Sequence, residues 1–144
     1  MRLWRISNHA DLNGRGGELA AGRWNDKGQR IVYCSDHLST AMLEILVHVD
    51  REDIPDSYQL LEISVPDNVK PVTIEPPAGW RDNPAITRAI WTRHVGESAG
   101  AVFAVPSAIM PFATNYLLDP AHRDHAKIVI VSATSHFIDR RFLT

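Results

Sequence analysis

Three side chains that can bind and process an anionic ligand lie within about twenty residues of one another. Arg23 belongs to the turn GRWND, Tyr33 follows the short apolar run RIV, and Glu44 comes in the next apolar segment. A guanidinium makes planar bidentate hydrogen bonds to phosphate oxygens, a tyrosine offers a flat ring, and a carboxylate can hold a hydroxyl or stabilise developing positive charge. Taken singly, each also has an ordinary explanation as a loop charge, a core anchor or a surface acid.

The helix predicted over residues 36–49 carries Glu44 on a narrow polar stripe. At about 100° per residue, apolar side chains cover most of its circumference, and only Thr40, Glu44 and His48 form a polar line. A helix that is apolar nearly all round is usually buried, and a buried carboxylate without a partner is costly. We therefore expect Glu44 either to open onto a cleft or, more simply, to face water beside His48.

The remaining patterns predict an α+β fold, a compact mixed β-sheet core with helices, because no regular βαβ alternation is present. A helix over residues 83–99 has Asn83 as its N-cap and Pro84 at its first position, and Asp36 is the expected cap of the earlier helix. Residues 8–22 are expected to form an irregular loop. Strands are predicted at 3–6, 30–35 and 58–66, as a short or edge strand within 69–80, and at three closing segments within 101–110, 114–119 and 127–133.

Length and composition indicate one soluble globular domain, residues 1–144. The formal net charge is -2, which gives no electrostatic basis for direct nucleic acid binding. Cys34 is the single cysteine, so an intrachain disulfide and a closed cysteine-rich zinc site are excluded. No segment approaches the ~20 apolar residues of a membrane span. We expect a cytoplasmic protein that does not bind membranes.

Several other residues carry side chains that could bind a ligand or a metal. His122 and His125 lack a third ligand at a metal-binding spacing, so no metal site is expected. Ser107 lacks the flanking glycines of a hydrolase nucleophile. Arg5 is either a phosphate contact or a solvent-facing arginine on an edge strand. The four tryptophans are expected to be core or interface anchors, with the role of Trp24 left open.

The segment GRWNDKGQRIVYCSDHLSTAMLEILVHV resembles the RES-domain family, in which a Gly-Arg-Trp-Asn turn leads to a strand ending in Tyr and then to a helix of the form Ala-x-x-Glu-x-x-x-His. LWRI near the start and TNYLLDPAH near the end also fit the family. The resemblance implies that Arg23, Glu44 and the serine of VPSA, Ser107, are the residues that name the family. It implies catalytic roles for these three, and substrate contacts from Arg23, Tyr33, Trp24, Arg5, Ser107 and Asn115.

The resemblance also implies a fold similar to that of ADP-ribosyltransferases and a toxin of a toxin–antitoxin pair. Such a toxin cleaves the nicotinamide–ribose bond of NAD+, with water or phosphate as acceptor, and so depletes the cell of NAD+. NAD+ is then a substrate, and no cofactor is expected. The implied partner is an antitoxin with an Xre-type helix-turn-helix domain, in a hetero-oligomer with the toxin.

Two other functions remain open. Transfer of ADP-ribose to a protein target shares its first chemical step with NAD+ degradation. An inactive binding module that sequesters a partner belongs to a different class, and the presence of Arg23, Tyr33, Glu44 and Ser107 together argues against it.

Overall fold

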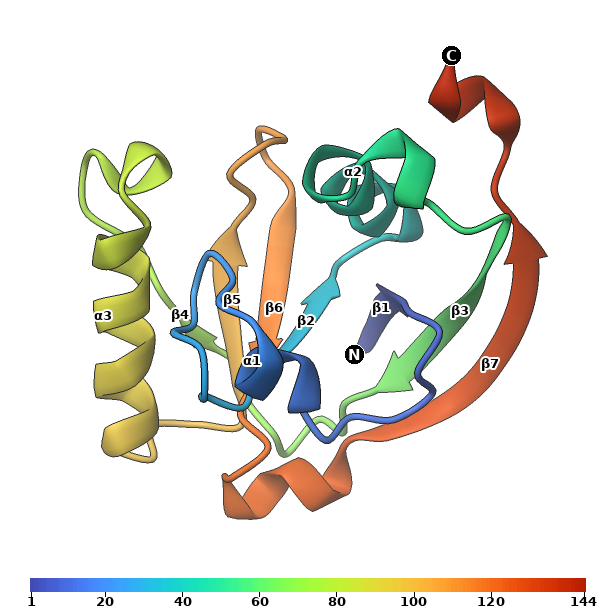
Figure 1. The fold of residues 1–144 in the computed structure, drawn as a ribbon. Helices are drawn as coiled ribbons and strands as arrows, with labels where there is room; N and C mark the ends of the chain where they lie inside the picture. The colour runs from blue at the N-terminus through green and yellow to red at the C-terminus, as the bar shows by residue number, and fades with distance from the viewer.

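A seven-stranded sheet in the order β4-β5-β6-β2-β1-β3-β7 forms the centre of the computed structural model, which describes residues 1 to 144 (Figure 1). Neighbouring strands are antiparallel except for β4 and β5, which are parallel. The predicted α+β class is therefore confirmed. The strands are β1 (Arg2–Ile6), β2 (Val32–Ser35), β3 (Ser57–Ser64), β4 (Val72–Thr73), β5 (Val102–Pro106), β6 (Thr114–Leu118) and β7 (Val129–Phe137).

The sheet is weakly joined at its middle, between β1 and β2. These strands are in register at one residue pair, Trp4 with Ser35. By contrast, β1 is paired with β3 along its whole length, and β2 is paired with β6 along its whole length. The sheet thus consists of two well-paired halves. The strands β1 and β2, which join the halves, separate on either side of their single paired position.

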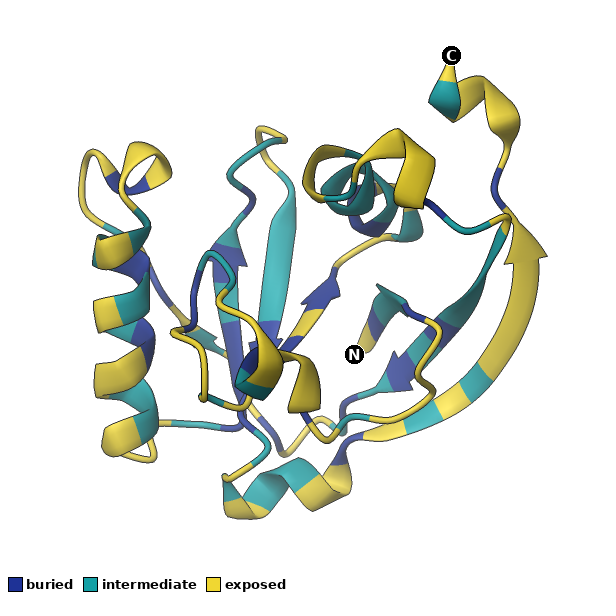
Figure 2. Ribbon diagram, viewed as in Figure 1, coloured by how far each residue is buried: buried dark blue, intermediate teal, exposed yellow.

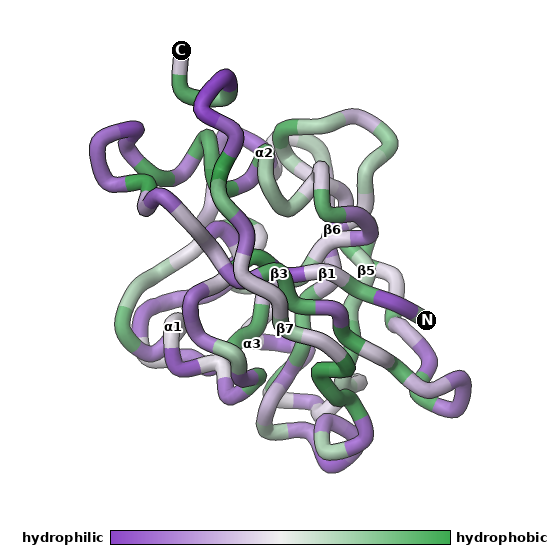
Figure 3. Tube along the Cα trace, turned by 90° about the vertical axis from the view of Figure 1, so that its right-hand side faces the viewer, coloured by the Kyte–Doolittle hydropathy of each residue, from purple (hydrophilic) through white to green (hydrophobic).

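Three α-helices and three short 3-10 helices lie between the strands, and a fourth 3-10 helix follows the last strand. Seen from the side of β7 (Figure 3), α1 lies on one side of the strands and the N-terminus emerges on the other. The helices are α1 (Arg15–Leu19), α2 (Leu38–His48) and α3 (Pro84–Gly96), and the 3-10 segments are η1 (Arg51–Asp53), η2 (Trp80–Asp82), η3 (Arg123–Lys127) and η4 (Arg140–Leu143). The predicted loop over residues 8–22 was wrong in one respect, because it contains α1.

Buried residues are found in most of the strands but not in β7 (Figure 2), and the buried hydrophobic residues form two clusters. One cluster is aliphatic and includes Leu3, Ile63 and Leu118. The other is aromatic, and in it Trp91 of α3 meets Phe103 of β5 edge to face at 5.4 Å between ring centroids. Trp24 belongs to this second cluster, so the turn that carries it is anchored on the core.

The two long helices begin differently. Asn83 caps α3 as predicted, with its side chain accepting the Ala85 amide at 3.2 Å. Asp36 does not cap α2; His37 does, through the amide of Ser39. The Asp36 carboxylate instead accepts the Thr40 hydroxyl at 3.0 Å and the Thr114 amide at 3.1 Å. It therefore fastens α2 to β6, a long-range contact that helix-capping statistics do not contain.

Helix α2 is less buried than its composition suggested. Only Thr40 and Ala41 are buried, whereas Val47 and His48 are exposed. The helix lies against β1 and β2, at the weak middle of the sheet. Its polar stripe therefore lies close to the place where the two halves of the sheet diverge.

The Asn83 cap gives a stability prediction. Replacing Asn83 with Ala removes the acceptor for the Ala85 amide and should lower the free energy of unfolding by about 1 kcal/mol. Urea unfolding followed by circular dichroism measures the change. Asn68→Ala, at an exposed position, is the control, and equal stability of the two variants would contradict the capping role.

Candidate active site

A cavity of about 340 Å³ lies at the divergence of β1 and β2. Trp4, Arg5 and Ile6 of β1 line it together with Tyr33, Cys34 and Ser35 of β2. Three consecutive residues of each strand line the cavity, so it lies against both strands near their single paired position. Helices α1 and α2, the turn around Arg23 and the β5–β6 hairpin complete its wall.

Glu44 faces this cavity and is held by one of its two carboxylate oxygens. Its Oε1 accepts hydrogen bonds from Asn115 Nδ2 at 2.8 Å and from Ser107 Oγ at 3.1 Å. Its Oε2 has no hydrogen bond within the protein, and lies 3.8 Å from Nε2 of His48 one turn away. The side chain is 24% exposed. The polar stripe of α2 therefore opens onto a cleft, and Glu44 presents one fixed oxygen edge to it.

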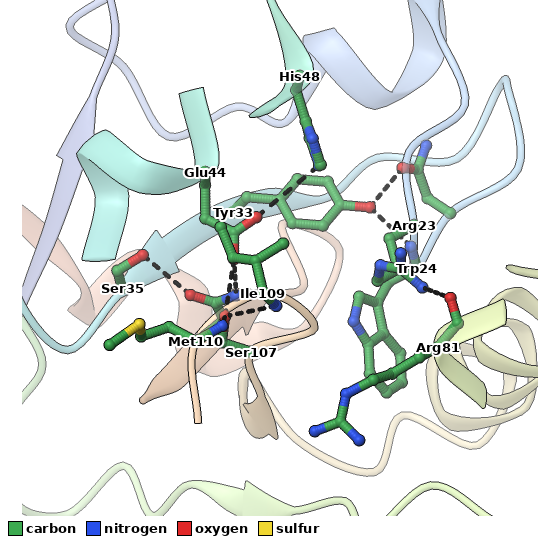
Figure 4. A network of polar contacts seen from close by, with 12 residues as sticks. Arg23, Trp24, Tyr33, Ser35, Glu44, His48, Arg81, Ser107, Ile109 and Met110 are labelled. Carbon is green, nitrogen blue, oxygen red and sulfur yellow. Dashed lines mark hydrogen bonds and ion pairs between the residues drawn. The ribbon is translucent and has the colours of Figure 1, made fainter. Parts of the chain in front are cut away.

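The two donors to Glu44 are themselves held in place (Figure 4). Ser35 Oγ donates to Asn115 Oδ1 at 3.0 Å, which fixes the orientation of the amide so that Nδ2 points at Glu44. Ser107 Oγ accepts the backbone amides of Ile109 at 3.3 Å and Met110 at 3.1 Å. Its single proton is thereby directed to Glu44. These contacts rigidify the carboxylate before any ligand arrives.

The turn that carries Arg23 is organised by Asn25, which is fully buried. Asn25 Oδ1 accepts the Gly22 amide at 2.9 Å and the Tyr33 hydroxyl at 2.7 Å. Its Nδ2 donates to the backbone carbonyls of Gly17 at 3.1 Å and Ala20 at 3.2 Å. One side chain thus ties together α1, the turn and β2.

The Tyr33 hydroxyl is fully used within the protein. It donates to Asn25 and accepts the Trp24 amide at 3.0 Å. Burial of the hydroxyl raises the pKa of Tyr33 to about 12, although the backbone hydrogen bond from Trp24 and the nearby arginines act in the opposite direction. The residue is nevertheless 37% exposed. Tyr33 therefore offers its ring, not its hydroxyl, to a ligand in the cavity, and Figure 4 shows that ring between Glu44 and Arg23.

Arg23 lies at the opposite end of the ring from Glu44. Its Nη1 donates to the backbone carbonyl of Arg81 at 3.0 Å, and its guanidinium carbon lies 5.8 Å from the centroid of the Trp80 ring. It forms no ion pair. An unneutralised guanidinium at the rim of a cavity is suited to bind an anion.

Helix α3 holds the backbone on both sides of this arginine. The Thr87 hydroxyl donates to the carbonyl of Arg23, and Arg88 Nε donates to the carbonyl of Gly22 at 2.8 Å. Thr87 is fully buried. The position of Arg23 is therefore fixed by its backbone, while most of its side-chain donors remain available.

The two other predicted contacts, Arg5 and Trp24, both line the cavity. The interpretation of Arg5 as an edge-strand residue was wrong, because β1 lies between β2 and β3. Its Nε is buried and has no hydrogen-bond partner. Trp24 is 2% exposed and packs tilted against Trp80 at 6.3 Å between centroids. Arg5 thus has a buried donor without an acceptor in the protein. Trp24 is mainly a core residue that also lines the cavity.

The histidines of the segment HRDH have structural partners. His122 Nδ1 accepts the Asp124 amide at 3.1 Å, and His125 Nε2 contacts the carbonyl of Leu12 at 2.7 Å. No three His, Cys, Asp or Glu side chains gather in a way that could hold a metal ion. Separately, none of the helices has both the length and the apolar character that crossing a membrane requires.

Sequence reasoning missed Ser35, Asn25 and Arg81. Ser35 and Asn25 are small neutral polar residues in a strand and a turn, where such residues are common, and only their complete burial reveals their importance. Arg81 lies far along the chain from Arg23. Of these three residues, only Asn25 could have been singled out from the sequence, because it is a polar residue inside the GRWN turn.

The family model of the RES domain matches residues 2–139. The chain belongs to the RES-domain family. The expected resemblance is therefore confirmed over nearly the whole chain.

Named relatives of this RES-domain protein are toxins. It is 44% identical over 127 residues to Toxin Res of Pseudomonas putida, covering 85% of this chain and 86% of that protein. It is 36% identical over 137 residues to the Prs ADP-ribosylating toxin of Sphingobium sp. strain YBL2, with 85% and 84% covered. It is also 34% identical to Toxin Res of Photorhabdus laumondii, with 99% and 97% covered. The chain is thus a RES-domain protein of the toxin type.

A solved structure supports the fold. The M. tuberculosis MbcT–MbcA toxin–antitoxin complex contains a chain that matches with a TM-score of 0.74, covering 94% of this chain and 84% of that one. The identity is 15%, so this likeness shows a shared fold.

The buried hydroxyl of Tyr33 gives a pH prediction for the RES-domain protein. The pKa is about 12 in the folded state and 10.0 in an ordinary environment, so unfolding between these values releases a proton. The contribution of Tyr33 to the free energy of unfolding is therefore complete below pH 10 and is lost as the pH rises toward 12.

Phenolate absorbance measures this directly. The difference between the wild type and Tyr33→Phe should show a midpoint near pH 12 while the protein remains folded. A midpoint near pH 10 in the native protein would show that the hydroxyl is not shielded from water as the structure places it.

Proposed function

We propose that this RES-domain toxin cleaves the nicotinamide–ribose bond of NAD+ and so depletes NAD+. The observation that carries the proposal is the geometry of Glu44, whose Oε1 is anchored by Asn115 and Ser107 while Oε2 is free at the cavity. The unpaired guanidinium of Arg23 lies beyond the Tyr33 ring at the other end. A ligand with a phosphate at one end and a sugar at the other matches this separation of charges.

The bond to be cleaved needs little acid catalysis. Nicotinamide in NAD+ is a cationic substituent, so it leaves with the bonding electron pair as a neutral molecule. The ribose carbon develops positive charge, which a nearby carboxylate stabilises. Glu44 Oε2 is placed to accept a ribose hydroxyl or to face this charge. A water or phosphate oxygen then bonds to the same carbon, and in the case of water a proton is released.

The other residues of the cavity would each bind a different part of NAD+. Arg23 suits the pyrophosphate, because a guanidinium can pair with two phosphate oxygens at once. The Tyr33 ring suits the nicotinamide or its ribose through stacking. Arg5 is a further donor for the substrate, since its buried Nε has no acceptor in the protein. Trp24 contributes an apolar edge to the cavity. Ser107 and Asn115 act mainly by fixing Glu44, which refines their predicted role as substrate contacts.

Transfer of ADP-ribose to a protein is the alternative within the same chemistry. It is favoured by one observation, the relationship to a toxin named for ADP-ribosylation of Prs. The alternative differs only in the acceptor that attacks the ribose carbon. The binding-module hypothesis is less well supported, because a protein without catalysis has no need of a carboxylate held by two oriented donors.

We further propose that an antitoxin holds the enzyme inactive by covering the cavity. The related fold occurs in a toxin–antitoxin complex. An Xre-type helix-turn-helix antitoxin would supply the DNA binding for which the net charge of -2 gives this chain no basis. Full NAD+ cleavage by a purified complex would refute this mode of inhibition.

Glu44→Gln tests the mechanism. The glutamine oxygen can accept both hydrogen bonds that Oε1 accepts, so the variant should fold with nearly the stability of the wild type. It loses the negative charge, so nicotinamide release should fall at least about 100-fold. Glu97→Gln, an exposed position, is the matched control. A folded Glu44→Gln variant with full activity would remove Glu44 from the mechanism.

A time course of NAD+ cleavage identifies the acceptor. Purified protein is incubated with NAD+ labelled in the adenylate half, with and without phosphate. Free ADP-ribose indicates hydrolysis, its phosphorylated form indicates phosphorolysis, and label on protein indicates transfer. Absence of nicotinamide release from folded, antitoxin-free protein would contradict the proposed activity.

Arg23→Lys tests the phosphate contact. Lysine keeps the charge but cannot form two parallel hydrogen bonds, so the KM for NAD+ should rise about tenfold. The backbone carbonyl that Thr87 binds is retained, and the turn should stay folded. Calorimetric titration with ADP-ribose gives the affinity without turnover. Unchanged affinity would contradict a bidentate contact.

A further inference from the structure

A second hollow of about 550 Å³ adjoins the cavity on the far side of Arg23. It lies between η2, which supplies Trp80 and Arg81, and the β5–β6 hairpin, which supplies Met110 and Phe112. Pro106 lines both the cavity and the hollow. Asn115 and Leu117 of β6 line the cavity, whereas Thr114 and Tyr116 line the hollow, so the two spaces face alternate residues of β6 and meet at Pro106 at the end of β5.

Contacts between side chains link the two spaces. Arg23 and Trp24 line the first, and Trp80 and Arg81 line the second. Arg23 Nη1 donates to the Arg81 carbonyl, and the Trp24 and Trp80 rings lie 6.3 Å apart. Figure 4 shows Arg81 beyond Arg23 and Trp24 on the side away from Glu44. The order along the surface is thus Glu44, then Arg23, then Arg81.

Two positive charges share one indole at this place. The guanidinium carbon of Arg81 lies 5.0 Å from the Trp80 centroid, and that of Arg23 lies 5.8 Å from it. Neither arginine has a carboxylate partner. Two like charges around one ring repel each other unless an anion lies nearby. A phosphate group can face both guanidinium groups, while Glu75 also lines the hollow.

We propose that the hollow at Trp80 and Arg81 binds the adenosine half of the dinucleotide, with Arg81 as a further substrate-binding residue. This subsite rests on the proposed cleavage of NAD+. A dinucleotide is linear, with its phosphates between two nucleosides. If the nicotinamide ribose lies at Glu44 and the pyrophosphate at Arg23, the adenosine continues past Arg23 in the direction of Arg81.

The size of the cavity leads to the same conclusion. A volume of about 340 Å³ is near the lower end of the range for drug-sized ligands, and a dinucleotide is larger than most of these. The second nucleoside therefore extends out of the cavity and onto an adjoining surface. The hollow is the neighbouring space that contains both a cation and exposed apolar side chains.

The chemistry of this surface suits adenine. Trp80 is only 7% exposed, so its ring supports the guanidinium of Arg81 and offers little surface of its own. A planar guanidinium stacks on aromatic rings, and arginine planes stack on bases in this way. Phe112 is fully exposed in the same hollow and adds an apolar surface for the purine.

Arg81→Ala isolates the contribution of this side chain. The substitution keeps the Arg81 carbonyl, so the hydrogen bond that positions Arg23 is retained. Arg93→Ala is the matched control, because it removes one exposed, unpaired arginine from the last turn of α3. Two ligands are compared, NAD+ and nicotinamide mononucleotide, which lacks the adenylate half.

We expect the KM for NAD+ to rise about tenfold more than the KM for nicotinamide mononucleotide in Arg81→Ala, with no such difference in Arg93→Ala. An equal rise for both ligands would show that Arg81 acts through Arg23, and would overturn the adenosine subsite. No rise for either ligand would also overturn it.

A binding measurement separates this proposal from the proposed reaction. Calorimetric titration with ADP-ribose needs no turnover, and Arg81→Ala should bind it about tenfold more weakly than the wild type. Weaker binding in a protein that releases no nicotinamide would support the subsite while contradicting the cleavage. Equal affinity of variant and wild type would overturn the subsite even if NAD+ is cleaved.

Discussion

The site depends on the weak joint in the middle of the sheet. Because β1 and β2 are in register only at Trp4 and Ser35, a cavity can form inside what would otherwise be a continuous, fully paired sheet. Each half is strengthened by long antiparallel pairing elsewhere, above all between β3 and β7. Helix α2 packs on β1 and β2 at this place and carries its only carboxylate there. The extensive pairing within each half stabilises the sheet although β1 and β2 are paired at only one position.

The turn around Arg23 meets a second constraint, which is the space around Asn25. A side chain at Gly22 would place its Cβ 2.6 Å from the Tyr33 hydroxyl and 2.8 Å from Asn25 Oδ1, and one at Gly17 would lie 2.2 Å from the Gln29 carbonyl. The glycines are therefore required by close approach to buried polar atoms. The turn is rigid for the same reason, since every polar atom of the Asn25 side chain is satisfied. A guanidinium mounted on it is placed without help from a ligand.

Sequence patterns predicted the elements better than the contacts between them. The α+β class, the Asn83 cap and the β4 edge strand follow from local chemistry, namely hydrophobic period, capping and proline. The predicted N-cap of α2 was wrong, because the Asp36 carboxylate accepts a hydrogen bond from the amide of Thr114, far along the chain. Glu44 could be singled out because a carboxylate on an apolar helix conflicts with its surroundings. Ser35 and Asn25 create no such conflict in sequence, and their roles depend on burial that only the folded chain shows.

The opposite charges of Glu44 and Arg23 lie at the two ends of one cavity. Glu44 and Arg23 do not pair with each other, although an ion pair between them would be the simplest way to neutralise both. Instead Glu44 is held by neutral donors, and Arg23 is held by a backbone carbonyl and an indole. Neutral partners fix the positions of the two groups without cancelling their charges. The Tyr33 ring between them keeps them apart, so the full strength of both charges stays available to a ligand that spans the cavity.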